Sequence, residues 1–175
     1  MHLTNTLTEY GTISKVLHWL SAIILFIQIP LGFYLVDLDF GDERITIENI
    51  HVTLGLIIFY IIIIRLINNV LNPTPKLDPS IFKGQRLLAK MNHVLLYITI
   101  LSITVSGILK KLFNGESLII IFKEIVINEN FELADQFYAI HIFSSYTLIG
   151  LIAIHIMAVV VHKLFFKDNL FKKMF

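Results

Sequence analysis

The stretch that decides the fold is residues 137–163, FYAIHIFSSYTLIGLIAIHIMAVVVHK. At 1.5 Å per residue, this apolar run is long enough to cross the roughly 30 Å hydrocarbon core of a bilayer as a helix. It contains His141 and, fourteen residues later, His155. At about 100° per residue, this spacing places both imidazoles on nearly the same helix face, about 21 Å apart along the axis. The stretch therefore predicts a membrane helix that carries two imidazoles at two depths.

Composition places most of the chain in the membrane. Hydrophobic residues make up 56% of the 175 residues and charged residues only 15%, whereas a soluble domain carries about 25% charged residues. Four stretches of spanning length run over about 16–36, 50–71, 91–112 and 137–163. The first exceeds a signal-peptide core and lacks a small-residue cleavage site, so we expect it to be retained. We predict one domain over residues 1–175, an all-α transmembrane four-helix bundle.

The positive charges are unevenly distributed over the two sides of this bundle. One side has Lys15, Arg65, Lys76, Lys83, Arg86, Lys90, Lys163, Lys167, Lys172 and Lys173. The other has Arg44, Lys110, Lys111 and Lys123 beside the acids Asp37, Asp39, Asp42, Glu43 and Glu48. Because cytoplasmic loops carry the excess of Lys and Arg, we expect both termini to be cytoplasmic. The net charge of +1 gives no indication of a nucleic-acid partner.

Four histidines can be paired by their depth in this topology. His51 begins the second span at the outer face, level with His141, while His18 begins the first span at the cytoplasmic face, closer to the level of His155. Ionisable groups inside a membrane usually indicate function, and His is an axial ligand of haem iron. We expect His51 with His141, and His18 with His155, to bind two b haems. The chain has no cysteine, which excludes covalent c-type attachment and cysteine-ligated iron–sulfur clusters.

Two glycines and a simpler role for the histidines leave alternatives open. Gly32 lies fourteen residues after His18, and Gly55 lies one turn after His51. Each glycine offers a bare surface to a porphyrin, but glycine also permits close helix contacts. Alternatively, the four histidines could serve only to form hydrogen bonds between helices. Divalent-metal transport is disfavoured because the centres of the spans lack Asp and Glu.

Other polar side chains near the span ends have more than one possible role. Lys15, Arg86 and Lys90 are candidates for contacts with haem propionates or a quinone, and they also fit positive-inside anchoring. His162 could exchange a proton with a quinone head group, since imidazole titrates near neutral pH, or could lie at the interface. His93 is a spare ligand, an interfacial hydrogen-bonding group or part of a quinone pocket.

The connecting segments also give two local predictions. Asn72-Pro73-Thr74-Pro75 should end the second helix, because proline lacks an N–H and restricts the preceding residue. The apolar run Leu118 to Phe122 is too short to span, and we expect it to lie at the outer interface.

The chain resembles the small bacterial cytochrome b-561 proteins over nearly its whole length. The matching residues are Lys15 to Trp19, Ile50-His51-Val52 with Gly55, Arg65-Leu66, Asn72-Pro73-Thr74-Pro75, His93, Asn130-Phe131-Glu132, Asp135, His141, Gly150, His155, His162 and Lys167-Asp168-Asn169. It departs from the family at Ile140, Val161 and Lys173, where Trp, His and Arg are common. The resemblance implies a dihaem membrane cytochrome with His18, His51, His141 and His155 as iron ligands.

The resemblance also implies an inner-membrane oxidoreductase that takes electrons from an outer-face donor, superoxide in a well-known type, and reduces ubiquinone. With both axial positions filled by imidazole, the iron should pass single electrons and not activate O₂. A cationic outer surface, from Arg44, Lys110, Lys111 and Lys123, would attract superoxide, although the neighbouring acids oppose it. The expected partners are membrane lipid, ubiquinone and superoxide, with the chain a monomer or homodimer. The alternatives are a haem b anchor and electron conduit of a dehydrogenase or hydrogenase, and a haem-free scaffold or transporter.

Overall fold

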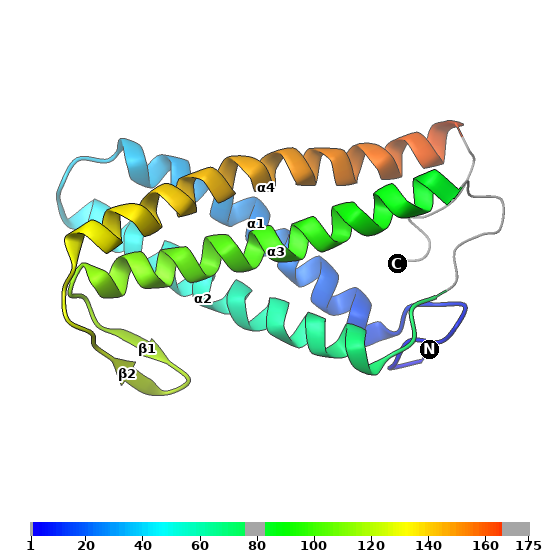
Figure 1. Cartoon of the computed structure of the whole chain (residues 1–175), viewed down its shortest axis with the longest axis horizontal. Helices are drawn as coiled ribbons and strands as arrows, with labels where there is room; N and C mark the ends of the chain where they lie inside the picture. The colour runs from blue at the N-terminus through cyan, green and yellow to red at the C-terminus, as the bar shows by residue number, and fades with distance from the viewer. Residues whose placement is uncertain (1, 76–82, 166–175) are drawn as a thin grey trace.

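The computed structural model describes residues 2–75 and 83–165. Four helices lie along one long axis (Figure 1): α1 (Thr12–Asp37), α2 (Asp42–Leu71), α3 (Lys83–Phe113) and α4 (Phe131–Phe165). A two-stranded antiparallel hairpin of β1 (Leu118–Ile120) and β2 (Lys123–Ile125) connects α3 to α4. Each helix is long and apolar enough to cross a membrane, which confirms the predicted transmembrane four-helix bundle. Lys76, the motif at 167–169, Lys172 and Lys173 lie outside the described residues.

The predicted spans fall inside longer helices. Acidic side chains stabilise the positive end of a helix dipole, and they occupy the first turns of α2 (Asp42 and Glu43) and α4 (Glu132). Both helices therefore begin well before their apolar segments. The predicted stop is confirmed at the end of α2, where Asn72 has an extended backbone immediately before Pro73.

The helices form two antiparallel pairs that face each other. The closest packing is between α3 and α4, followed by α1 with α2 and then α2 with α3. Buried apolar side chains, among them Ile24, Ile58, Ile62 and Leu148, form the core between the pairs. The first residue of α1 and the last of α4 lie at the same end, here called the N-terminal end, and the β1–β2 hairpin lies toward the opposite end, here called the hairpin end (Figure 1).

Candidate functional site

Four histidines meet in two pairs between the facing helices. The ring centroids of His51 on α2 and His141 on α4 lie 6.1 Å apart, and those of His18 on α1 and His155 on α4 lie 6.3 Å apart. These are the same two pairs that the sequence predicts from the depth of each histidine in its span. Because α4 carries one member of each pair, the pairs are separated by about 21 Å along that helix.

The ring separations fit a single metal ion between the members of each pair. A transition metal bonds an imidazole nitrogen at about 2.0–2.1 Å, and the ring centre lies about 1.1 Å beyond the nitrogen, so opposed rings have centroids about 6.3 Å apart. Residues 2–75 and 83–165 contain no group of three or more His, Cys, Asp and Glu that could enclose a metal. Each pair therefore fits a metal that brings its remaining ligands with it, as haem iron does.

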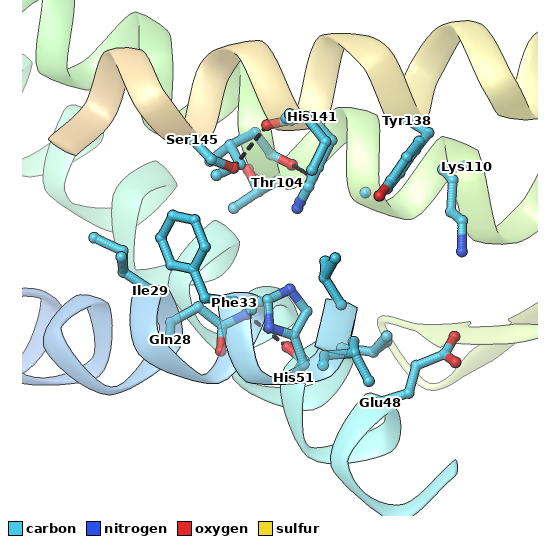
Figure 2. A pocket seen from close by; sticks show the side chains of 18 of the residues that line it. Gln28, Ile29, Phe33, Glu48, His51, Thr104, Lys110, Tyr138, His141 and Ser145 are labelled. Carbon is cyan, nitrogen blue, oxygen red and sulfur yellow. Dashed lines mark hydrogen bonds between the residues drawn. The ribbon is translucent and has the colours of Figure 1, made fainter. Parts of the chain in front are cut away.

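A cavity of about 570 Å³ separates His51 from His141. All four helices contribute to its mainly apolar lining, and the two imidazoles point into it from opposite sides (Figure 2). Cofactor and small-molecule sites typically occupy about 300–1,000 Å³ and are lined mostly by apolar groups. The cavity is therefore suitable for a large apolar cofactor held between two imidazoles.

Two groups on α3 orient the imidazole of His141. Its Nδ1 lies 2.8 Å from the carbonyl oxygen of Ile103. Since a carbonyl only accepts hydrogen bonds, Nδ1 carries the proton and Nε2 keeps its lone pair, which is the usual arrangement for a metal-bound histidine. A Cβ on Gly107 would lie 3.0 Å from Cε1 and 3.1 Å from Nδ1 of the same ring, so the glycine provides the space that this ring occupies.

The surroundings of His51 involve α1. A Cβ on Gly32 would lie 3.1 Å from Cε1 of His51, and Gln28 Nε2 donates a hydrogen bond of 2.8 Å to the His51 carbonyl oxygen. His51 Nδ1 and Gln28 Oε1 are both buried without a hydrogen-bond partner among the described residues. Gly55 faces Gln28, since its Cβ would lie 3.5 Å from Nε2. Gly32 therefore accommodates an imidazole, and both glycines line the cavity.

A cation adjoins the other histidine pair. Arg65 donates to Ser21 Oγ at 2.6 Å and to His18 Nδ1 at 3.3 Å, and its guanidinium carbon lies 5.4 Å from the centre of the Tyr97 ring. No carboxylate forms an ion pair with Arg65 among the described residues. Because arginine only donates, His18 Nδ1 is an acceptor and Nε2 carries the proton. A metal bond at Nε2 therefore requires that this proton leave.

His93 provides a third imidazole at the level of the second pair. Its ring lies edge-on to that of His155, with centroids 5.1 Å apart, and its Nδ1 donates to the Ala89 carbonyl oxygen at 2.6 Å. Its Nε2 therefore keeps a lone pair. The structure places His93 beside His155 and away from the His51–His141 cavity.

The remaining candidates lie toward the N-terminal end. His162 follows His155 by two helical turns, about 10 Å along α4. Lys15 and Arg86 are half-buried, whereas Lys90 is exposed. Trp19 contacts His18 edge-on, with ring centroids 5.5 Å apart.

The four cations expected to attract an anion at the hairpin end are not equivalent. Lys111 is only 8% exposed and forms ion pairs with Glu48, at 2.9 Å, and with Glu116. Its charge is therefore balanced, contrary to the expectation from sequence. Lys110 lines the cavity (Figure 2) and has no ion-pair partner among the described residues. Lys110 therefore remains available to an anion at the cavity.

Sequence reasoning missed three contributors to these sites. Gln28 and Gly107 were not singled out, and Arg65 was noted only as a basic charge near a span end and as part of the family pattern. Each is a polar or small residue inside an otherwise apolar helix. That pattern was a usable signal, because such residues in membrane helices usually meet a polar group or a close neighbour.

The fold and the paired imidazoles define a class of protein. An apolar four-helix bundle whose facing helices present two bis-imidazole sites, in a chain without cysteine, is a membrane cytochrome of the b type.

Comparison with known proteins gives the family. The model of the family described as prokaryotic cytochrome b561 matches residues 9–175. The chain is 29% identical over 178 residues to cytochrome b561 homolog 2 of Escherichia coli (strain K12), covering 99% of this chain and 95% of that protein. The chain belongs to the prokaryotic cytochrome b561 family. It is a multi-pass inner-membrane protein of haem b electron transfer.

Proposed function

We propose that this chain transfers single electrons across the inner membrane from superoxide at the outer face to ubiquinone, through two haems b. The observation that carries the proposal is the presence of two imidazole pairs at two depths, with separations of 6.1 Å and 6.3 Å. His51 and His141 hold one haem, and His18 and His155 hold the other. Each haem, when bound, supplies a one-electron carrier whose axial positions are both filled by imidazole.

The protein's own groups fix the imidazoles at the hairpin end. The Ile103 carbonyl oxygen holds the proton of His141 on Nδ1 and so directs Nε2 into the cavity. Gly107 and Gly32 leave space behind the two rings. The mainly apolar lining of the cavity disfavours water between them. Together these groups give a preorganised site for two nitrogen ligands.

Charge supports the direction of transfer. The N-terminal end carries most of the Lys and Arg, which favours a cytoplasmic location for that end and an outer location for the hairpin end. Superoxide is a small anion, and Lys110, which lines the cavity and has no ion-pair partner among the described residues, would attract it. At the cytoplasmic end, His162, Lys15, Arg86 and Lys90 are the candidates for contact with ubiquinone or with haem propionates.

The haem assignment is tested by counting haem in purified variants. The detergent-purified protein should contain two b haems per chain, measured by pyridine haemochrome, with low-spin bands in the reduced-minus-oxidised spectrum. His51→Ala and His141→Ala should each remove the same haem, and His18→Ala and His155→Ala the other, as distinguished by reduction potential. His93→Ala is the control and should keep both. A haem-free wild type, or loss of one haem in His93→Ala with none lost in His18→Ala, would refute the assignment.

The donor and acceptor are tested separately from the haems. Stopped-flow mixing of the oxidised dihaem protein with superoxide should reduce the haems rapidly, and added ubiquinone should reoxidise them. If superoxide has no effect while a co-purifying dehydrogenase or hydrogenase subunit reduces the haems, the chain is an electron conduit for that enzyme. In that case the superoxide proposal is wrong, although the haem assignment stands.

A further inference from the structure

We propose that the β1–β2 hairpin is inserted in the membrane, with its tip, Ile121 and Phe122, among the lipid acyl chains of the leaflet at the hairpin end. This surface is separate from both histidine pairs. The proposal does not depend on the electron donor or on the acceptor.

The position of the hairpin against α2 places its tip at membrane depth. The backbone N–H of Ile121 donates a hydrogen bond of 3.1 Å to the hydroxyl of Tyr60. Tyr60 is nine residues beyond His51 in α2, or about 13.5 Å further along the helix toward the N-terminal end. In Figure 1 the hairpin lies below α2, and its tip is directed back toward the N-terminal end. Its tip therefore lies beside the spanning part of α2.

The side chains at the tip match an apolar surrounding. Phe122 is 100% exposed and Ile121 is 73% exposed. Ile119 on β1 is 69% exposed, whereas Leu118 at the base is buried against the protein. In water such a tip would expose three large apolar side chains. Burying a large apolar side chain stabilises it by about 1.5–3 kcal/mol relative to exposure to water. Beside lipid, the same surface is favourable and continues the lipid-facing surface of the helices.

One backbone donor at the tip of the hairpin has a partner within the protein. A backbone N–H without a partner is costly in hydrocarbon. The strands pair with each other from Leu118 with Ile125 to Ile120 with Lys123, and the Tyr60 hydroxyl accepts the N–H of Ile121 at the turn. The N–H of Ile121 is therefore satisfied within the protein, and the side chains of the tip face its surroundings.

The turn itself is built from residues that do not favour it. Ile121 and Phe122 have φ values of 49° and 63°, in the left-handed region where Asn and Gly are preferred and a β-branched residue is strained. An Asn-Gly turn would close the same hairpin with less strain. Turn formation alone therefore does not explain two large apolar residues here, whereas contact with acyl chains does.

Charged side chains on β2 limit the depth of insertion. Lys123 and Glu124 follow the tip directly, and both are exposed. Lysine can extend its ammonium group to the headgroup layer while its stem stays among apolar groups. We therefore place Lys123 and Glu124 at the headgroups and only the tip among the acyl chains.

The absence of cysteine allows a direct test, because any introduced cysteine is unique. Phe122→Cys is spin-labelled in the haem-loaded protein, reconstituted in vesicles of phosphatidylcholine and phosphatidylglycerol. Collision rates are then measured with oxygen, which concentrates in lipid, and with a water-soluble nickel chelate. Phe40→Cys is the matched control, since Phe40 is 96% exposed in the loop between α1 and α2. The oxygen-to-nickel collision ratio should be several-fold higher at position 122 than at position 40.

A second label separates the lipid contact from the folding of the hairpin. Ile119→Cys reports on the hairpin and leaves the turn intact, and its ratio should also exceed that at position 40. Adding Ile121→Asn with Phe122→Gly to this variant favours the turn while removing the apolar tip, so the ratio at position 119 should fall toward the control. Equal ratios at positions 122 and 40, or no change at 119 after the turn replacement, would overturn the proposal.

Discussion

Replacing Gly107 with alanine should weaken the binding of one of the two proposed haems. The added methyl would lie 3.0 Å from Cε1 and 3.1 Å from Nδ1 of His141, where ordinary contacts begin at 3.4 Å. The ring therefore has to move by a few tenths of an ångström. It cannot do so freely, because its Nδ1 donates the 2.8 Å hydrogen bond to Ile103. The shift must either distort that hydrogen bond or misdirect Nε2.

The size of the effect follows from how strictly a metal ligand must be placed. A ligating group has to be held within about 0.5 Å of its productive position. Loss of the hydrogen-bonded support of a ligating histidine typically lowers metal affinity by about 10- to 100-fold, or about 1.4–2.8 kcal/mol. We expect Gly107→Ala to fall in this range. Since the haem is not covalently attached, the loss of affinity appears as lower occupancy after purification.

Other glycines supply matched controls for this substitution. Gly150 has nothing within 4 Å of an added Cβ, so Gly150→Ala should retain both haems. Gly32→Ala should resemble Gly107→Ala, because its methyl would lie 3.1 Å from Cε1 of His51. Gly55→Ala should have a smaller effect, since 3.5 Å from Gln28 Nε2 is an ordinary contact.

The assay is haem per chain by pyridine haemochrome, combined with a potentiometric titration of the remaining haem. Gly107→Ala should lose the same haem as His141→Ala and keep the other at its wild-type potential. Two haems per chain with unchanged potentials in Gly107→Ala would refute the argument that this glycine accommodates the ring. Equal loss in Gly150→Ala would show that any methyl group in the bundle disturbs haem binding.

Four further substitutions test the surroundings of the sites. Gln28→Leu removes the hydrogen bond to the carbonyl of His51 and should lower occupancy of that haem by the haemochrome assay. Lys110→Gln should slow stopped-flow reduction by superoxide about fivefold at low salt, since adjacent unit charges in water interact by about 1 kcal/mol. Lys111→Gln should leave that rate unchanged but lower the free energy of unfolding by about 1–3 kcal/mol, because it breaks two ion pairs. Arg65→Met should lower one haem potential by about 100 mV in a redox titration, because a charge about 7 Å from a redox centre contributes about 2.4 kcal/mol at a dielectric of 20.

The arrangement of the histidines could be predicted because it depends on few quantities. The depth of a residue in a spanning helix follows from the rise per residue and from the ends of the apolar run. The alternation of span direction then places His51 with His141 and His18 with His155. None of these steps requires knowledge of side-chain packing.

The details of support required the structure, because they depend on contacts between distant segments. Gly107 and His141 are on different helices, and nothing in their sequence positions shows that a Cβ would meet the ring. The balanced charge of Lys111 likewise depends on Glu48, which is 63 residues away. The β1–β2 hairpin lacks an Asn-Gly turn, so its sequence indicated only an apolar run at the interface.

The two histidine pairs differ in their electrostatic surroundings, and the difference favours one direction of electron flow. At the hairpin end, two carboxylates, Glu48 and Glu116, form ion pairs with Lys111, and Glu48 also interacts with the neighbouring Lys110. Arg65 beside His18, in contrast, has no ion-pair partner among the described residues. An unbalanced cation stabilises an added electron nearby. In the proposed orientation, an inward electron moves against a membrane potential that costs about 2.3 kcal/mol per 100 mV for a full crossing. At 100 mV, moving the electron over about 21 Å of a roughly 30 Å core costs about 1.6 kcal/mol. The interaction of roughly 2.4 kcal/mol with Arg65 offsets this cost.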